Sequence, residues 1–259
     1  MAENVSGRKA VAARALSLLD LTSLNDDDDE AAVDALYARA RTDFGPVAAV
    51  CIWPRFVTRA RDALQDSGIK VAAVANFPEG GGDIAAALRD TRGIVADGAD
   101  EVDLVMPYRR WLAGDTPLAS EMVAACKEAC GSQASLKVIL ETGELKDPAV
   151  IYDAATALIV AGADFIKTSS GRVAVSATTE AAEAVLKAIK DLGAGAGFKA
   201  AGGIRDTATA GTYLALADRI MGANWADARR FRFGGSGLLN DLLAVLRDEA
   251  PPPVAKRGY

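Results

Sequence analysis

Eight short apolar segments recur at intervals of roughly 30 residues, and this spacing limits the possible folds more than any other feature of the chain. Most of the segments contain several β-branched or aromatic residues, as buried strands do. Alanine-rich stretches with helical periodicity lie between them. The segments are LLDLT (18–22), VAAVCIW (47–53), KVAAVANF (70–77), DEVDLVMP (100–107), LKVILET (136–142), DFIKT (164–168), GFKAAG (197–202) and FRFGGS (231–236).

This alternation of strand and helix predicts parallel βαβ units. Eight such strands favour a closed (β/α)8 (TIM) barrel, with an open doubly wound sheet as the alternative. The length of 259 residues suits one domain, because barrels of about 200 to 250 residues commonly fold as a single unit. We therefore expect one α/β domain over residues 1–250 and a flexible, proline-rich tail at 251–259.

The charge and the cysteine content limit the partners and the compartment. The net charge is −6, and no cluster of lysines and arginines is long enough to follow a nucleic-acid backbone. No apolar run reaches the roughly 18 residues of a membrane span, and the polar start lacks the apolar core of a signal peptide. The three cysteines offer no disulfide framework. These features predict a cytoplasmic protein that binds neither nucleic acid nor membrane.

The chain has no histidine. Catalytic triads that contain histidine and histidine-ligated zinc are therefore excluded, and acid–base chemistry must come from Lys, Asp, Glu, Tyr or Cys. Cys126 and Cys130 stand four residues apart on an expected helix, with no other ligand type nearby, so packing is favoured over metal binding. The acidic run 26–30 is read as a solvated helix start, with a metal site as the less favoured alternative.

Strand alternation predicts which charged residues point into the barrel. It places Asp103, Lys167 and Lys199 inside, and the two lysines lie at or near their strand ends, on the face that carries active sites in this fold. A simple buried ionic network remains the alternative explanation for such residues. Three more charged residues share the inward orientation: Glu101, Glu141 and Lys137, the last of which lies near a strand start and is expected to be structural.

Lys167 and Lys199 should stand side by side, because one βα unit separates them and neighbouring strands lie about 4.8 Å apart. Mutual repulsion and burial should lower the pKa of one amine from about 10.4 to about 7 or 8. A neutral lysine attacks carbonyl compounds and forms a Schiff base, which assists cleavage of an adjacent C–C bond. Asp103 could exchange protons through Lys199, or could merely balance charge.

Glycine-rich turns follow the last two strands and predict a phosphate site, because backbone N–H groups and helix N-termini bind anions. The segment after residues 231–233 gives Gly234, Gly235 and Ser236, and Gly171 with Arg172 is expected to close a third side. The other turn contributes Gly202, Gly203 and Arg205.

Seven segments that cover nearly the whole chain resemble the deoxyribose-phosphate aldolase family. The resemblance implies a TIM barrel that reversibly cleaves 2-deoxy-D-ribose 5-phosphate to acetaldehyde and D-glyceraldehyde 3-phosphate, without a metal or an organic cofactor. The segments are LLDLTSLN (18–25), VCIWPRF (50–56), ADEVDLVMPYR (99–109), LKVILETGEL (136–145), ADFIKTSSG (163–171), FKAAGGIR (198–205) and FRFGGSG (231–237).

The same resemblance implies individual roles. Lys167 would form the Schiff base, Lys199 would tune it, Asp103 would relay protons, and the terminal Tyr259 would donate a proton. Members of the family are commonly homo-oligomers, so a homodimer is expected. A sugar-phosphate-binding barrel without catalysis and a metal-dependent barrel enzyme are the alternatives. Further substrate-binding residues are implied at Asp20, Thr22, Cys51 and Thr168.

Overall fold

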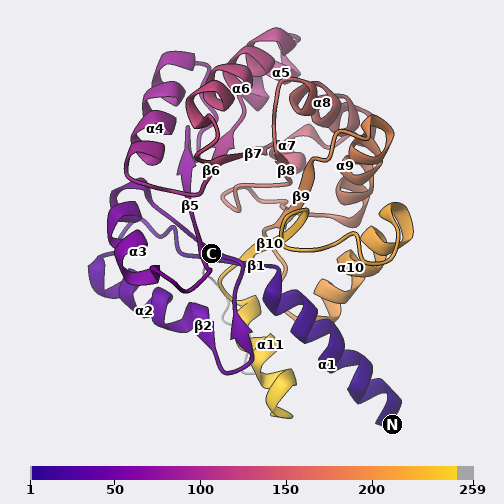
Figure 1. Cartoon of the computed structure of the whole chain (residues 1–259). Coiled ribbons are helices and arrows are strands. Elements are labelled where there is room, and N and C mark those ends of the chain that lie inside the picture. The colour runs from indigo at the N-terminus through magenta and orange to yellow at the C-terminus, as the bar shows by residue number, and fades with distance from the viewer. Residues whose placement is uncertain (1, 250–259) are drawn as a thin grey trace.

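The computed structural model of the chain describes residues 2–249, in which eight parallel strands close into a barrel (Figure 1). The first strand pairs with the last on one side and with the second barrel strand on the other, so the open-sheet alternative is wrong and the predicted TIM barrel is confirmed. In order around the barrel the strands are β1 (Leu19–Thr22), β4 (Ala49–Ile52), β5 (Lys70–Ala75), β6 (Glu101–Val105), β7 (Ser135–Ile139), β8 (Phe165–Lys167), β9 (Gly197–Ala201) and β10 (Phe231–Gly235).

Helices surround the barrel, and polar side chains cap the N-termini of several of them. Asp83 and Asp206 are the N-caps of α4 and α10, and Thr178 caps α9. The helices are α1 (Ala2–Ser17), α2 (Glu30–Ala40), α3 (Val57–Leu64), α4 (Ile84–Ala96), α5 (Tyr108–Leu112), α6 (Thr116–Cys130), α7 (Thr142–Leu145), α8 (Pro148–Val160), α9 (Thr179–Leu192), α10 (Thr207–Met221) and α11 (Leu238–Arg247), with a 3₁₀ turn, η1, at Pro54–Phe56.

Two elements of the structure were absent from the sequence-based expectation. The helix α1 precedes the barrel and packs beside α10 and α11, burying Ala12, Ala15 and Leu16 (Figure 1). A short hairpin of β2 (Arg41–Thr42) and β3 (Gly45–Pro46) follows α2. The expected tail at 251–259 lies outside the described residues, so its predicted flexibility stays a prediction.

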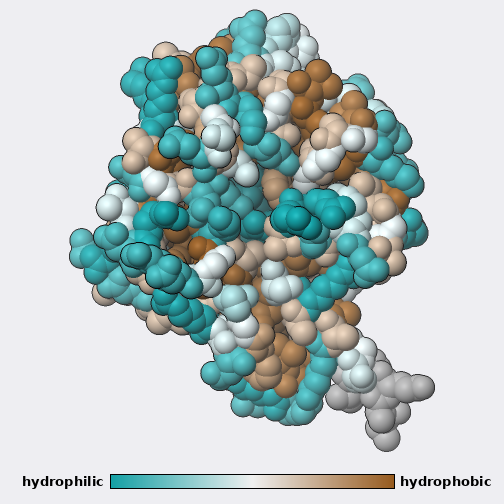
Figure 2. All heavy atoms as spheres, viewed as in Figure 1, coloured by the Kyte–Doolittle hydropathy of each residue, from teal (hydrophilic) through white to brown (hydrophobic). Residues whose placement is uncertain are grey.

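The apolar core lies between the strands and the helices, while the barrel interior holds charged residues. Val102 and Leu104 of β6 are fully buried on the helix-facing side, as strand alternation requires, and Asp103 between them is also fully buried but points inward. The face seen in Figure 2 is largely hydrophilic near its centre, with hydrophobic residues in patches closer to the rim. Within residues 2–249 no helix is long and apolar enough to cross a membrane.

Candidate active site

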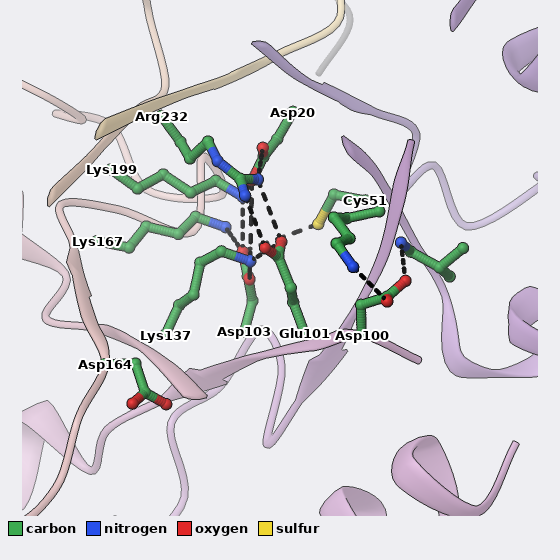
Figure 3. Close-up of polar contacts among 12 residues, drawn as sticks. Asp20, Cys51, Asp100, Glu101, Asp103, Lys137, Asp164, Lys167, Lys199 and Arg232 are labelled. Atoms are coloured by element: carbon green, nitrogen blue, oxygen red, sulfur yellow. Dashed lines mark hydrogen bonds and ion pairs between the residues drawn. The ribbon is translucent and has the colours of Figure 1, made fainter. Parts of the chain in front are cut away.

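Lys167 and Lys199 are paired residues on the neighbouring strands β8 and β9, and both side chains point into the barrel (Figure 3). The Nζ atom of each lysine lies 2.8 Å from the same atom, Oδ2 of Asp103. Lys167 is the last residue of β8 and is 1% exposed. The structure thus brings together three of the four residues that the sequence analysis proposed as catalytic.

Asp103 lies at the centre of this group. Its second oxygen, Oδ1, accepts a hydrogen bond of 3.0 Å from Nζ of Lys137. Burial alone would raise the pKa of Asp103, but the surrounding lysines outweigh burial and hold that pKa well below its usual range. Asp103 is therefore a carboxylate throughout the neutral pH range.

Lys199 is the amine best stabilised as a cation. Its Nζ lies 2.6 Å from Oδ2 of Asp20 in addition to its contact with Asp103. Burial lowers the pKa of Lys199, but the two carboxylates outweigh burial and raise that pKa well above its ordinary value. Lys199 therefore remains an ammonium group at neutral pH.

The buried network expected as an alternative is also present, and it includes one residue that the sequence analysis missed. Arg232 of β10 donates a hydrogen bond of 2.7 Å to Asp20 and one of 2.8 Å to Glu101. Lys137 pairs with Glu101 as well. Strand alternation could have predicted that Arg232 points into the barrel, because it stands between two apolar residues, Phe231 and Phe233, which are both buried.

Glu141 does not join this network. Strand β7 ends at Ile139, and Glu141 adopts a left-handed backbone conformation with φ of 57°. Its carboxylate accepts the backbone N–H of Ser170 at 3.1 Å, and burial raises the pKa of Glu141. Its contact therefore holds the loop after β8.

Three further substrate-binding residues implied by the family resemblance, Cys51, Thr22 and Thr168, are buried and differ in their contacts. Sγ of Cys51 is 3.8 Å from Oδ2 of Asp103, and burial raises the pKa of the Cys51 thiol. The hydroxyls of Thr22 and Thr168 bond to backbone groups instead, that of Thr22 to the carbonyl of Asp20 and that of Thr168 to both the N–H and the carbonyl of Ala201. Thr168 thus links β8 to β9.

A cavity of about 290 Å³ lies among the loops that the sequence analysis assigned to phosphate. The loop after β8 packs tightly there: a Cβ atom at Gly202 would lie 2.4 Å from Cβ of Ser176. Only glycine fits at that position, which also has φ of 87°. The predicted residues that line the cavity are Gly171, Gly202, Gly203, Arg205, Gly234, Gly235 and Ser236.

Two helices begin beside this cavity, and their first turns differ. At the start of α10, Asp206 accepts the N–H of Thr209 at 2.7 Å, and Asp241 accepts the N–H of Thr207 at 2.7 Å. At the start of α11 the N-cap residue is Gly237, which has no side chain to accept a hydrogen bond from the first turn. The N-terminus of α11 is therefore the better site for an anion.

Arg172 has a different position from its neighbour Gly171. Its guanidinium group donates to the carbonyl of Leu24 and lies 3.1 Å from Oδ1 of Asp26, in the segment between β1 and α2. Arg172 does not line the cavity. Tyr259, the fourth predicted catalytic residue, lies outside the described residues. In residues 2–249 no three potential ligand side chains are grouped to hold a metal ion.

Comparisons with known proteins agree with this site. Residues 14–226 match the model of the DeoC/LacD family aldolases. A deoxyribose-phosphate aldolase of Agrobacterium fabrum (strain C58 / ATCC 33970) is 51% identical over 252 residues, which are 97% of each protein.

Solved structures show the same similarity. The apo form of a protein from Toxoplasma gondii ME49, assigned as a deoxyribose-phosphate aldolase, has a TM-score of 0.86 and 27% identity, covering 95% of this chain and 99% of the other. A tetrameric deoxyribose phosphate aldolase of Aeropyrum pernix has a TM-score of 0.74 and 25% identity, covering 94% and 97% of the two chains.

The matches extend over most of the chain and include the strands that carry Asp103, Lys167 and Lys199. They confirm the aldolase assignment made from the sequence. The chain belongs to the DeoC/LacD aldolase family.

Proposed function

We propose that this aldolase reversibly cleaves 2-deoxy-D-ribose 5-phosphate to D-glyceraldehyde 3-phosphate and acetaldehyde, through a Schiff base on Lys167. One observation carries the proposal: Lys167 and Lys199 share a single carboxylate oxygen of Asp103, each at 2.8 Å. The relative from Agrobacterium fabrum, 51% identical, is named as a deoxyribose-phosphate aldolase and supports the choice of substrate.

The chemistry follows from a neutral amine at Lys167. The amine attacks the C1 aldehyde of the open-chain sugar, and loss of water gives an iminium ion. Removal of the C3 hydroxyl proton breaks the C2–C3 bond, and the electron pair moves to the iminium group to form an enamine. D-Glyceraldehyde 3-phosphate leaves first; protonation at C2 and hydrolysis then release acetaldehyde and restore the amine.

Lys199 and Asp103 have separate roles in this proposal. The ammonium group of Lys199 disfavours a second positive charge on Lys167 and so favours the nucleophilic form. Asp103 fixes the positions of both amines and exchanges protons with them through its hydrogen bonds. Cys51, 3.8 Å from Asp103, lies against the same oxygen and is placed to contact the acetaldehyde part of the substrate.

The glycine-lined cavity would hold the phosphate group. Its lining supplies backbone N–H groups from the turns after β9 and β10, together with Arg205 and Ser236. The N-terminus of α11 adds a partial positive charge. Neither contact requires a metal, so the proposal keeps the prediction of a cofactor-free enzyme.

Turnover and trapping test the proposal together. Release of D-glyceraldehyde 3-phosphate should persist in EDTA, and borohydride with acetaldehyde should attach an ethyl group to Lys167. Lys167→Leu should abolish both activities, whereas Lys187→Leu, on the exposed face of α9, should leave them unchanged. Binding of the sugar phosphate without trapping would indicate a barrel that only binds, and loss of turnover in EDTA would indicate a metal enzyme.

Tyr259 keeps its predicted role as a proton donor in this proposal. A chain ending at residue 250 should still trap acetaldehyde on Lys167 but should exchange the C2 protons of acetaldehyde with deuterium more slowly. Equal exchange rates in the two chains would remove Tyr259 from the mechanism.

We also propose that the enzyme is a cytoplasmic homodimer. Three unpaired, buried cysteines suit a reducing compartment. The relative from Aeropyrum pernix is described as tetrameric, which supports self-association but not the number of subunits. Light scattering coupled to size-exclusion chromatography distinguishes a dimer from a tetramer.

A further inference from the structure

Six of the seven charged side chains at the centre of the barrel form a closed ring of alternating charge (Figure 3). From Asp103 the ring runs through Oδ1 to Lys137, which pairs with Glu101. The ring closes at the other oxygen of Asp103, Oδ2, which pairs with Lys199. The remaining links are Glu101 to Arg232 at 2.8 Å, Arg232 to Asp20 at 2.7 Å and Asp20 to Lys199 at 2.6 Å.

Lys167 is attached to this ring but is not part of it. The ring contains three carboxylates and three cations, so its charges balance without Lys167. Among the described residues, Asp103 is the only carboxylate within ion-pair distance of Lys167, and it already serves two ring cations. A proton on Lys167 would therefore leave one buried positive charge in excess.

Arg232 closes the ring on the side opposite Asp103. Its Nε donates to the carbonyl of Ala228 at 2.5 Å. Its guanidinium group lies 5.8 Å from the centre of the aromatic side chain of Phe165. A guanidinium group does not lose its proton under ordinary conditions, unlike the amine of a lysine. Arg232 is thus a permanent, buried positive charge, 5% exposed.

The pKa shifts of Asp20, Lys137 and Arg232 favour their charged forms. The pKa of Asp20 is lowered, because Lys199 and Arg232 outweigh the effect of burial. The pKa of Lys137 is raised, because Asp103 and Glu101 outweigh burial, and that of Arg232 is raised by Asp20 and Glu101. These residues stay charged over the neutral range.

We propose that Arg232 is a positioning residue that acts through the ring to set the pH at which Lys167 becomes a nucleophile. Without the charge of Arg232, the ring carries one negative charge in excess, and that charge stabilises an ammonium group on Lys167. The inference rests on the proposed function, in which Lys167 forms the Schiff base. Arg232 itself does not contact Lys167, so its effect is electrostatic and orienting.

Other titratable groups also face Lys167 and must stay constant in a test. They are Glu141, which follows β7, and Cys51 on β4, together with the ring members Asp103 and Lys199. Burial raises the pKa of both Glu141 and Cys51. Neither group contacts Arg232, so changes at position 232 leave them in place.

Three variants give the inference a signed test. Arg232→Gln removes a cation, Glu101→Gln removes a carboxylate, and the double variant removes both and restores the balance. The measured quantity is the pH midpoint of the rate at which acetaldehyde and borohydride modify Lys167. Arg232→Gln should move the midpoint up by about one pH unit, a rate loss of about tenfold at fixed lower pH. Glu101→Gln should move it down, and the double variant should lie near the unmodified enzyme.

The outcomes separate this inference from the proposed function. Failure to modify Lys167 in the unmodified enzyme would overturn the proposed function itself. Normal modification with the same midpoint in every variant would overturn only the role of Arg232, as would shifts of the same sign for Arg232→Gln and Glu101→Gln. If Arg232→Gln does not fold, Glu101→Gln and the double variant still decide, because they differ only at position 232.

Discussion

Lys167 and Lys199 occupy paired positions on β8 and β9 and donate to one oxygen of Asp103. The two amines nevertheless differ in their partners. Lys199 also pairs with a second carboxylate, that of Asp20, whereas Lys167 pairs with Asp103 alone among the described residues. Position on the strands brings the two amines together. Lys199 therefore has two carboxylate neighbours, and Lys167 has one.

Removal of the charge at Lys199 should therefore slow the reaction without removing the nucleophile. We expect Lys199→Met to lower kcat/KM for 2-deoxy-D-ribose 5-phosphate by about 10²-fold or more, because a positive neighbour and a proton-exchange partner are both lost. Lys187→Met on the surface of α9 is the control. Steady-state kinetics test this expectation, and an unchanged kcat/KM would show that Lys199 only fills space.

Gly202 should control recognition of the phosphate. Its φ of 87° and the contact of 2.4 Å that a Cβ would make with Ser176 mean that Gly202→Ala displaces the loop beside the cavity. KM for the phosphorylated sugar should rise by about tenfold, equivalent to losing about 1.4 kcal/mol of binding. Unphosphorylated 2-deoxyribose should be turned over as before.

The matched control for Gly202 is Gly193, which has a φ of 60° and open space where a Cβ atom would lie. Gly193→Ala introduces similar backbone strain far from the cavity, so it should lower stability but leave both KM values unchanged. An equal rise in KM for the two sugars in Gly202→Ala would show a general distortion of the site.

The ring should stabilise the fold in a pH-dependent way. The pKa of Asp103 is lower in the folded chain than the unfolded value of about 3.9. Its stabilising contribution is therefore complete above about pH 4 and is lost as the pH falls towards the folded pKa. Asp103→Asn should lower the free energy of unfolding by about 3 to 5 kcal/mol at neutral pH, since it breaks a buried ion network.

The difference between the two proteins should narrow as the pH drops below about 4, where the unfolded carboxylate of Asp103 takes up its proton. Urea unfolding at a series of pH values measures this. A difference that stays constant into acid would mean that the carboxylate of Asp103 is not held ionised by its lysine neighbours.

The cysteines should be unreactive in the folded enzyme. Cys51, Cys126 and Cys130 are fully buried, and burial raises the pKa of each thiol, that of Cys130 to about 12. Because the thiolate is the reactive form, iodoacetamide at neutral pH should label none of them until urea is added. Peptide mass spectrometry reads the result, and labelling of Cys51 in the native enzyme would show that its pocket opens.

Strand periodicity predicted the barrel and the inward side chains of Asp103, Lys167 and Lys199, because alternation along a strand is a local property. Glu141 lies two residues beyond the end of β7 at Ile139, so the alternation rule no longer applies to it. Arg232 obeyed the same rule between two buried phenylalanines, but an isolated arginine gave no hint of its partners. Its contact with Glu101 joins residues 131 positions apart, and closure of the ring depends on the whole barrel.

The N-terminal helix was missed for a different reason. Its buried residues Ala12, Ala15 and Leu16 follow helical spacing, but the helix carries few large apolar side chains, so its sequence gives a weak signal. Contacts with α10 and α11, including the ion pair of Arg14 with Asp218 at 2.6 Å, hold it in place. Such tertiary contacts cannot be read from a local pattern.

The most direct test of the central claim is the selectivity of acetaldehyde and borohydride among the lysines of the native enzyme at neutral pH, read by peptide mass spectrometry. An uncharged Lys167 predicts an ethyl group on Lys167, with Lys199 and exposed lysines such as Lys187 unmodified at the same time of reaction. Modification of Lys199 in place of Lys167, or equal modification of Lys167 and Lys187, would contradict the account.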